Sequence, residues 1–84
     1  MKLPAHTKLK GRNIIGQNMQ RIRYACNPVV TLDDLAARLE VRGLFLSKST
    51  LSKIENRQRV VLDFEVLELA VALRVPITQL YGQK

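Results

Sequence analysis

The stretch that decides the fold is residues 46–59, LSKSTLSKIENRQR. Ser47 is a favourable N-cap residue, and it predicts a helix over residues 48–56. Leu51 and Ile54 are three residues apart, so they share one face of this helix, which we expect to be buried. Such a helix has a polar and cationic opposite face, which carries Lys48, Ser49, Ser52 and Lys53. These side chains suit the acceptors of DNA bases and phosphates, although an ordinary solvated helix face would have the same composition.

Apolar residues at helical spacing predict four further helices. The first covers residues 14–26 and stops before Pro28, because proline disfavours the helical conformation in the residue before it. The second begins after Thr31, an N-cap residue followed closely by two acids that suit the positive end of a helix dipole. A fourth helix covers residues 63–73, and a short fifth covers residues 76–82. With no strand pattern, five short helices predict an all-α domain.

The length of 84 residues allows one small domain. A hydrophobic content of 46% predicts a folded chain, and the scarcity of aromatic residues predicts a core of Leu, Ile, Val and Ala. Residues 1–13 differ from the rest, because they lack helical periodicity and their charged side chains are all positive. We therefore expect a flexible basic N-terminal arm over residues 1–13, followed by the helical domain over residues 14–84.

The charge of the chain is positive and unevenly distributed. Lys and Arg number 14 against seven Asp and Glu, which gives a formal net charge of +7. Residues 1–23 hold six basic side chains and no acid, whereas residues 62–73 hold three acids and no base. A cationic end of this kind favours a polyanion partner, since binding phosphates releases condensed counterions. A surface charge that serves only to keep the protein soluble would give the same net charge, so this alternative stays open.

Several function classes find no support in the sequence. Cys26 is the only cysteine, so no internal disulfide can form, and no apolar run is long enough for a signal peptide or a membrane span. These features predict a cytoplasmic protein without membrane contact. His6 is the only histidine and lies in the expected arm, and the four glycines form no phosphate-binding loop. We therefore expect no enzymatic activity, no metal site, no cofactor and no small-molecule ligand.

The predicted second and third helices, with a turn between them and a cationic third helix, resemble a helix-turn-helix. The chain is similar to the Cro/repressor-type (XRE-like) helix-turn-helix family of phage and bacterial regulators over residues 14–82. The resemblance rests on Thr31, Leu35, Ala36, the run Leu51-Ser52-Lys53-Ile54-Glu55-Asn56, Leu69, Ala70, Leu73, Val75 and Leu80. It implies a five-helix, lambda-repressor-like DNA-binding domain, bacterial or phage-encoded, in which the second and third helices form the helix-turn-helix.

The resemblance further implies a sequence-specific transcriptional regulator, of the repressor type, that binds double-stranded DNA in the major groove through residues 48–56. A lysine favours guanine as its partner, and the base-contacting residues would be Lys48, Ser49, Ser52 and Lys53. The phosphate-binding residues would be Thr50, Asn56, Arg57, Arg59, Lys10 and Arg12. Family members commonly bind as dimers, which leaves a homodimer open, with the region of Leu80 and Tyr81 as its natural contact.

The same resemblance implies a structural ion pair between Arg23, near the end of the first helix, and Glu55 in the third helix. We expect this pair to be partly buried and to fix the third helix against the first. Both residues would then belong to the scaffold and would not contact DNA.

The sequence departs from the family pattern at three places. Leu32 stands where the family usually has a Gln that contacts the DNA backbone, and it is either a core residue or an exposed apolar contact. Arg57 stands where a Gly is usual, and because the left-handed conformation is costly for Arg, we expect the turn there to differ. The connection before the third helix is longer by roughly five residues. In this connection we expect Phe45 to pack in the core rather than to form an interface.

Two other function classes compete with DNA-binding regulation. A protein-interaction module, such as an antitoxin or a partner of polymerase or of another regulator, would be supported by the apolar connection at residues 41–46 and by Val60 and Val61. A non-specific nucleic-acid binder would use the positive charge without a defined helix register, and it usually stacks bases on aromatic side chains. The aromatic residues of this chain are scattered and form no such platform, namely Tyr24, Phe45, Phe64 and Tyr81.

Overall fold

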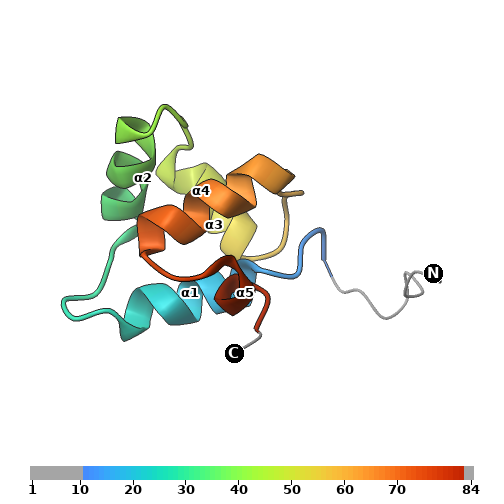
Figure 1. Cartoon of the computed structure of the whole chain (residues 1–84). Coiled ribbons are helices and arrows are strands. Elements are labelled where there is room, and N and C mark those ends of the chain that lie inside the picture. Colours follow the sequence, from blue (N-terminus) through green and yellow to red (C-terminus); the bar gives the residue numbers. More distant parts are fainter. Residues whose placement is uncertain (1–10, 83–84) are drawn as a thin grey trace.

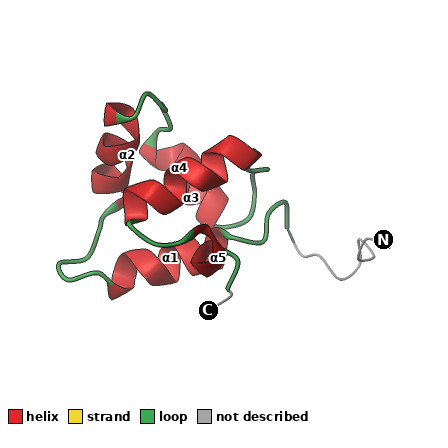
Figure 2. Ribbon diagram, viewed as in Figure 1, coloured by secondary structure: helices red, strands yellow, loops and turns green. Residues whose placement is uncertain are grey.

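Five α-helices and the loops between them make up the computed structural model, which describes residues 11–82 (Figure 1). The helices are α1 (Gly16–Ala25), α2 (Leu32–Val41), α3 (Lys48–Glu55), α4 (Asp63–Leu73) and α5 (Ile77–Leu80). Every predicted helix is present, with its ends within two residues of the expected positions. The described part of the chain contains no β-strand (Figure 2), so the all-α prediction is confirmed. None of these five helices is long and apolar enough to cross a membrane.

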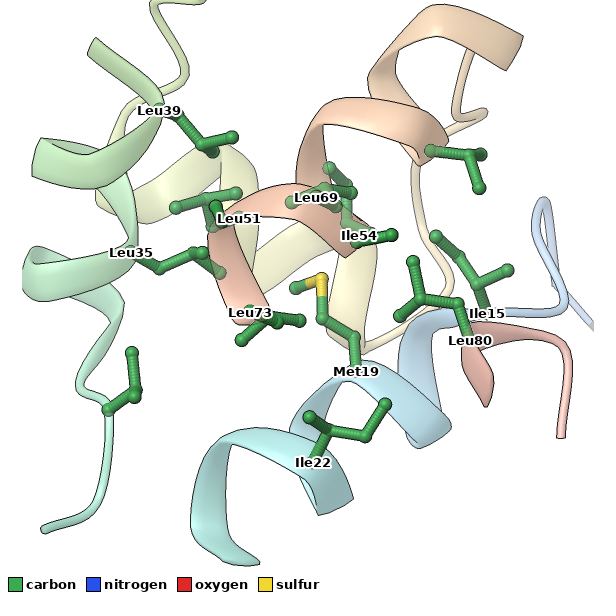
Figure 3. Close-up of a cluster of buried hydrophobic side chains, with 14 residues drawn as sticks. Ile15, Met19, Ile22, Leu35, Leu39, Leu51, Ile54, Leu69, Leu73 and Leu80 are labelled. Atoms are coloured by element: carbon green, nitrogen blue, oxygen red, sulfur yellow. The ribbon is translucent and has the colours of Figure 1, made fainter. Parts of the chain in front are cut away.

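A single aliphatic core lies between the helices. Side chains from all five helices and from the residue before α1 converge on it (Figure 3). Eight side chains are less than about 2% exposed, namely Ile15, Met19, Leu35, Leu39, Leu51, Ile54, Leu69 and Leu80. Burial of aliphatic surface on this scale is the main favourable term in the folding of a small domain. The core is therefore built from the residue types that the composition predicted.

The two predicted N-cap residues both cap their helices. The Thr31 hydroxyl accepts a hydrogen bond from the Asp34 amide at 3.0 Å, and the Asp34 carboxylate accepts one from the Thr31 amide at 3.1 Å. This reciprocal capping box satisfies two backbone donors at the start of α2, and the bond from the Thr31 amide lowers the pKa of Asp34. At the start of α3, the Ser47 hydroxyl accepts a hydrogen bond from the Thr50 amide at 3.2 Å. Local sequence chemistry thus fixes where α2 and α3 begin.

The turn after α3 contains Arg57 in the left-handed conformation, with φ of 59°. Our expectation that this turn would differ from one with Gly was therefore wrong. The Gln58 amide donates to the Lys53 carbonyl at 2.8 Å, and the Arg57 amide donates to the Ile54 carbonyl at 2.9 Å. This is the Schellman pattern, and its two hydrogen bonds offset the cost, on the order of 1–2 kcal/mol, of a left-handed non-glycine residue. α4 ends in the same way at Arg74, with φ of 61°.

Residues 11–13 belong to the folded domain, so the expected boundary of the arm was too late in the chain. The Asn13 side-chain amide donates to the carbonyl oxygens of Ile54 at 3.0 Å and Arg59 at 2.8 Å, and the Arg12 amide donates to the Arg57 carbonyl at 2.8 Å. These bonds tie the chain before α1 to the end of α3. Residues 1–10 of the expected arm, Lys10 included, lie outside the described residues.

Gly16 allows α1 to begin directly against the end of α3. A β-carbon at this position would lie 2.2 Å from the Ile54 carbonyl oxygen, which is backbone and cannot turn aside. A hydrogen bond of 2.8 Å from the Gly16 amide to the Asn13 side-chain oxygen holds the same junction from the other side. The close approach of two backbones is a common reason for glycine. It sets the position of α3 on α1.

Candidate nucleic-acid interface

α3 presents one face to the core and the other to solvent. Leu51 and Ile54 are completely buried, whereas Lys48, Ser49 and Lys53 are exposed and Ser52 is half-buried. The predicted division of this helix into two faces is therefore confirmed. Because the two aliphatic side chains are held by the core, the polar face has a fixed orientation on the domain.

Arg23 and Glu55 form a buried ion pair, as the family resemblance implied. Arg23 Nε donates to Glu55 Oε2 at 2.7 Å, and Nη2 donates to Oε1 at 2.8 Å, so the contact is bidentate. The two side chains are only 5% and 4% exposed. The third Arg23 nitrogen, Nη1, donates to the Val30 carbonyl at 2.9 Å. Hydrogen bonding to Glu55 raises the pKa of Arg23, and the pair joins α1, the loop before α2, and α3.

The hydroxyl groups at the start of α3 form a small network. Ser47 Oγ lies 3.1 Å from Ser49 Oγ and 2.9 Å from Thr50 Oγ1, both within hydrogen-bond distance. Thr50, expected at a phosphate, is half-buried and has its hydroxyl within this cap. Ser49 remains exposed beside it. The network holds the first turn of α3 together and directs Ser49 and Lys48 outward.

Lys48 lies close to an acidic residue that the sequence reasoning did not connect with it. Its Nζ is 3.8 Å from Asp33 Oδ2, and both side chains are largely exposed. Asp33 is in the first turn of α2, so the contact depends on how α2 and α3 pack. An exposed pair at this distance is weak, but the carboxylate partly cancels the charge that Lys48 offers to a phosphate or a base. Lys53 lies about one and a half turns further along α3 and is exposed. Its side chain forms no ion pair within residues 11–82.

Arg59, expected at a phosphate, is held within the domain. Its Nη1 and Nη2 donate to the two carboxylate oxygens of Glu65 at 2.9 and 3.0 Å. Glu65 is 3% exposed and also accepts a hydrogen bond from the Leu62 amide at 2.9 Å. Arg59 Nη1 also donates to the Val60 carbonyl at 3.1 Å, so Arg59 forms a structural ion pair within the domain, which the sequence did not predict. Its contact with a phosphate stays a prediction. The sequence spacing gave no signal for the ion pair, since residues six apart meet here only because the chain turns before α4.

The Arg59–Glu65 pair predicts how stability depends on pH. Hydrogen bonding from Arg59 lowers the pKa of Glu65 below its ordinary value of 4.5, so the stabilisation is complete above that pH and is lost as the pH falls through the folded-state value. We expect Glu65→Gln to lower the free energy of unfolding at pH 7 by about 1–3 kcal/mol. The variant should also lose less further stability than the wild type below about pH 4.5, as measured by denaturant unfolding at several pH values.

A matched control is Glu40→Gln, because Glu40 is exposed and makes no hydrogen bond to another described residue through its side chain. This variant should follow the wild-type pH dependence. Asp34 and Glu68 also have lowered pKa values, so some acid sensitivity will remain in Glu65→Gln. If the free energy of unfolding changed with pH in the same way in the wild type and in Glu65→Gln, the role assigned to the Arg59–Glu65 pair would be contradicted.

Three of the expected phosphate-binding residues gather at the C-terminal end of α3. Asn56 follows the helix and is exposed, Arg57 is half-buried in the next position, and Arg12 is exposed beside it through its backbone bond to Arg57. Gly11 packs closely here as well, because a β-carbon on it would lie 2.6 Å from that of Arg57. The chain before α1 thus brings a second cationic residue to the end of the candidate recognition helix. This convergence could not be derived from sequence spacing.

The connection between α2 and α3 differs from the expectation at Phe45. This side chain is 74% exposed, so the prediction that it packs in the core was wrong. The residues on either side, Leu44 and Leu46, are half-buried and pack against the core. The two leucines occupy the inward positions of this connection, and Phe45 between them faces solvent. Leu32, for which two placements were open, is half-buried against the core.

No group of three or more His, Cys, Asp or Glu side chains suited to a metal ion occurs within residues 11–82. Comparisons of the chain with models of known protein families, with curated proteins and with solved structures find no match. Function must therefore be argued from the geometry of the surface.

Proposed function

We propose that this protein is a sequence-specific transcriptional regulator that binds double-stranded DNA, with α2 and α3 as a helix-turn-helix and α3 in the major groove. The observation that carries the proposal is the arrangement of α3. Its apolar side is completely buried, and its outward side combines ammonium and hydroxyl groups on a rigidly held helix. Hydrogen-bond donors on a helix of fixed orientation are what base recognition in the major groove requires. Repression is the mode of regulation we propose.

The scaffold around α3 supports this proposal. The bidentate contact between Arg23 and Glu55 ties the last turn of α3 to α1, and the junction at Gly16 sets the distance between the same two helices. A contact surface that must select among base sequences loses discrimination if its side chains can shift by about 1 Å. Both features restrict such movement.

The base-contacting residues of the proposed interface are Lys48, Ser49, Ser52 and Lys53. We expect Lys53 to contribute more than Lys48, because Asp33 offsets part of the charge of Lys48. The phosphate contacts are assigned to Arg12, Asn56 and Arg57, which lie together at the end of α3. Arg59 stays a predicted phosphate contact, although Glu65 holds both of its terminal nitrogens.

A second candidate function is a protein-interaction module, as in an antitoxin. The observation that favours it is the exposure of large apolar side chains away from α3, among them Val41 at 90% and Phe45 at 74%. Scattered exposed apolar residues are normal on soluble domains, so this observation weighs less than the ordered face of α3.

Titration with a short duplex of random sequence at two salt concentrations tests the proposal. A DNA-binding domain should bind the pool at about 50 mM salt and lose roughly a hundredfold in affinity at about 200 mM, since several phosphate contacts release counterions. Fluorescence anisotropy of the labelled duplex gives both values. Failure to bind at the lower salt concentration would contradict the proposal and favour the interaction module.

A further inference from the structure

α4 carries apolar side chains on two opposite sides. Its inner side contributes Val66, Leu69, Ala70 and Leu73 to the core. Its outer side carries three large apolar residues at spacings of three and four, Phe64, Leu67 and Val71, which we call the outer stripe. Their exposed fractions are 53%, 51% and 41%. A helix that is apolar on both sides is usually covered on both sides. In Figure 1, α4 crosses in front of α3 with nothing from residues 11–82 drawn over it.

The ends of the outer stripe carry opposite charges. Asp63 begins α4, and within residues 11–82 its carboxylate accepts a hydrogen bond only from the neighbouring Phe64 amide, at 2.6 Å. Arg74 follows the last residue of α4 and is exposed. Neither takes part in the four ion pairs formed within residues 11–82. Asp63 lies four residues before Leu67, a spacing that returns to the same side of the helix, and Arg74 lies directly after the last helical residue in the left-handed conformation.

We propose that two copies of this chain form a symmetric homodimer through the outer stripes of their α4 helices, packed antiparallel. A two-fold axis near Leu67 places Phe64 of one copy against Val71 of the other. It also brings Asp63 of each copy close to Arg74 of its partner, so the dimer contains two such pairs of opposite charges. In a two-fold interface, residue i meets j and j meets i, and this stripe is self-complementary in that sense.

The overall charge favours this side of the domain for self-association. The chain has a net charge of +7, so two copies repel each other wherever basic residues face. Residues 62–73 contain three acids and no basic side chain, so this repulsion is reduced where two α4 helices face each other. In the region suggested by the family resemblance, Leu80 is completely buried in the core, and Tyr81 and Ile77 are exposed at 44% and 39%.

Sedimentation of the full chain without DNA tests the dimer. We expect the mass of the wild type to rise with concentration from one chain towards two. Leu67→Glu should raise the dissociation constant at least about tenfold, since it places two carboxylates at the axis of an apolar contact. The matched control is Ile14→Glu, which changes another aliphatic side chain, 56% exposed, in the segment before α1 and should leave the dissociation constant unchanged. Circular dichroism checks that both variants are folded.

Exchanging the charges at positions 63 and 74 distinguishes the proposed pairing from non-specific association. Asp63→Arg and Arg74→Asp should each weaken the dimer, and the double variant should restore association towards the wild-type value because the two charges are again matched. A wild type that stays monomeric at all concentrations would overturn the proposal. Equal effects of Leu67→Glu and Ile14→Glu, or a double variant that associates more weakly than either single variant, would also overturn it. Since no DNA is present, this outcome is independent of the proposed regulatory function.

Discussion

Replacing Glu55 with Ala is expected to lower the free energy of unfolding by about 3 kcal/mol. The change leaves the Arg23 guanidinium buried, with only 5% of its side chain exposed, and removes two of its three hydrogen-bond acceptors. The expected loss is the cost of leaving a buried charge without its carboxylate partner. In a domain of this size, about 3 kcal/mol corresponds to a melting temperature lower by roughly 12–24 °C.

The control for Glu55→Ala is Glu68→Ala. Glu68 pairs with Arg42 on the surface, where the Arg42 side chain is 42% exposed, and solvent screens such pairs strongly. The melting temperature of Glu68→Ala, measured by circular dichroism, should therefore stay close to that of the wild type. An unchanged melting temperature in Glu55→Ala would show that the pair does not fix α3 on α1.

The second large effect is expected in DNA binding by variants of α3. Lys53→Ala should weaken binding to the preferred sequence by about 1–3 kcal/mol and relax the preference at the base that it contacts. Lys48→Ala should cost less, because Asp33 already offsets part of its charge at 3.8 Å. In the double variant the two losses should add approximately, since the side chains lie on different turns of the helix.

Arg21→Ala is the matched control for this prediction. Arg21 is an exposed cation on α1 that donates to the Asn18 side chain at 2.9 Å, and its removal changes the net charge by the same amount as a single lysine variant. It should weaken binding to all sequences slightly and equally. If Arg21→Ala changed the sequence preference and Lys53→Ala did not, the outward side of α3 would not be the contact surface.

The positions of the helices could be predicted from the sequence because their signals are local. Thr31 and Ser47 cap helices through bonds to residues three positions away, and Leu51 and Ile54 reveal the buried face of α3 by their spacing alone. The pair of Arg23 and Glu55 is not local, and it was predicted only through a resemblance to a family. Its presence in the structure does not depend on that resemblance.

The features that the sequence did not predict depend on how separate segments meet. The resemblance placed Arg59 at a phosphate and Lys48 at a base, but their partners Glu65 and Asp33 are set by the turn before α4 and by the packing of α2 on α3. Phe45 has the composition of a core residue and is exposed because its two neighbours occupy the inward positions. Charge and hydropathy therefore indicated which residues matter, while tertiary packing decided which of them remain available to a partner.

Selection of bound sequences from a library of random double-stranded DNA tests the central claim most directly, namely that the outward face of α3 recognises base sequence. We predict enrichment of one motif that contains guanine, and a changed motif when the selection is repeated with Lys53→Ala. Recovery of no motif by the folded wild type, or an identical motif from Lys53→Ala, would contradict the claim.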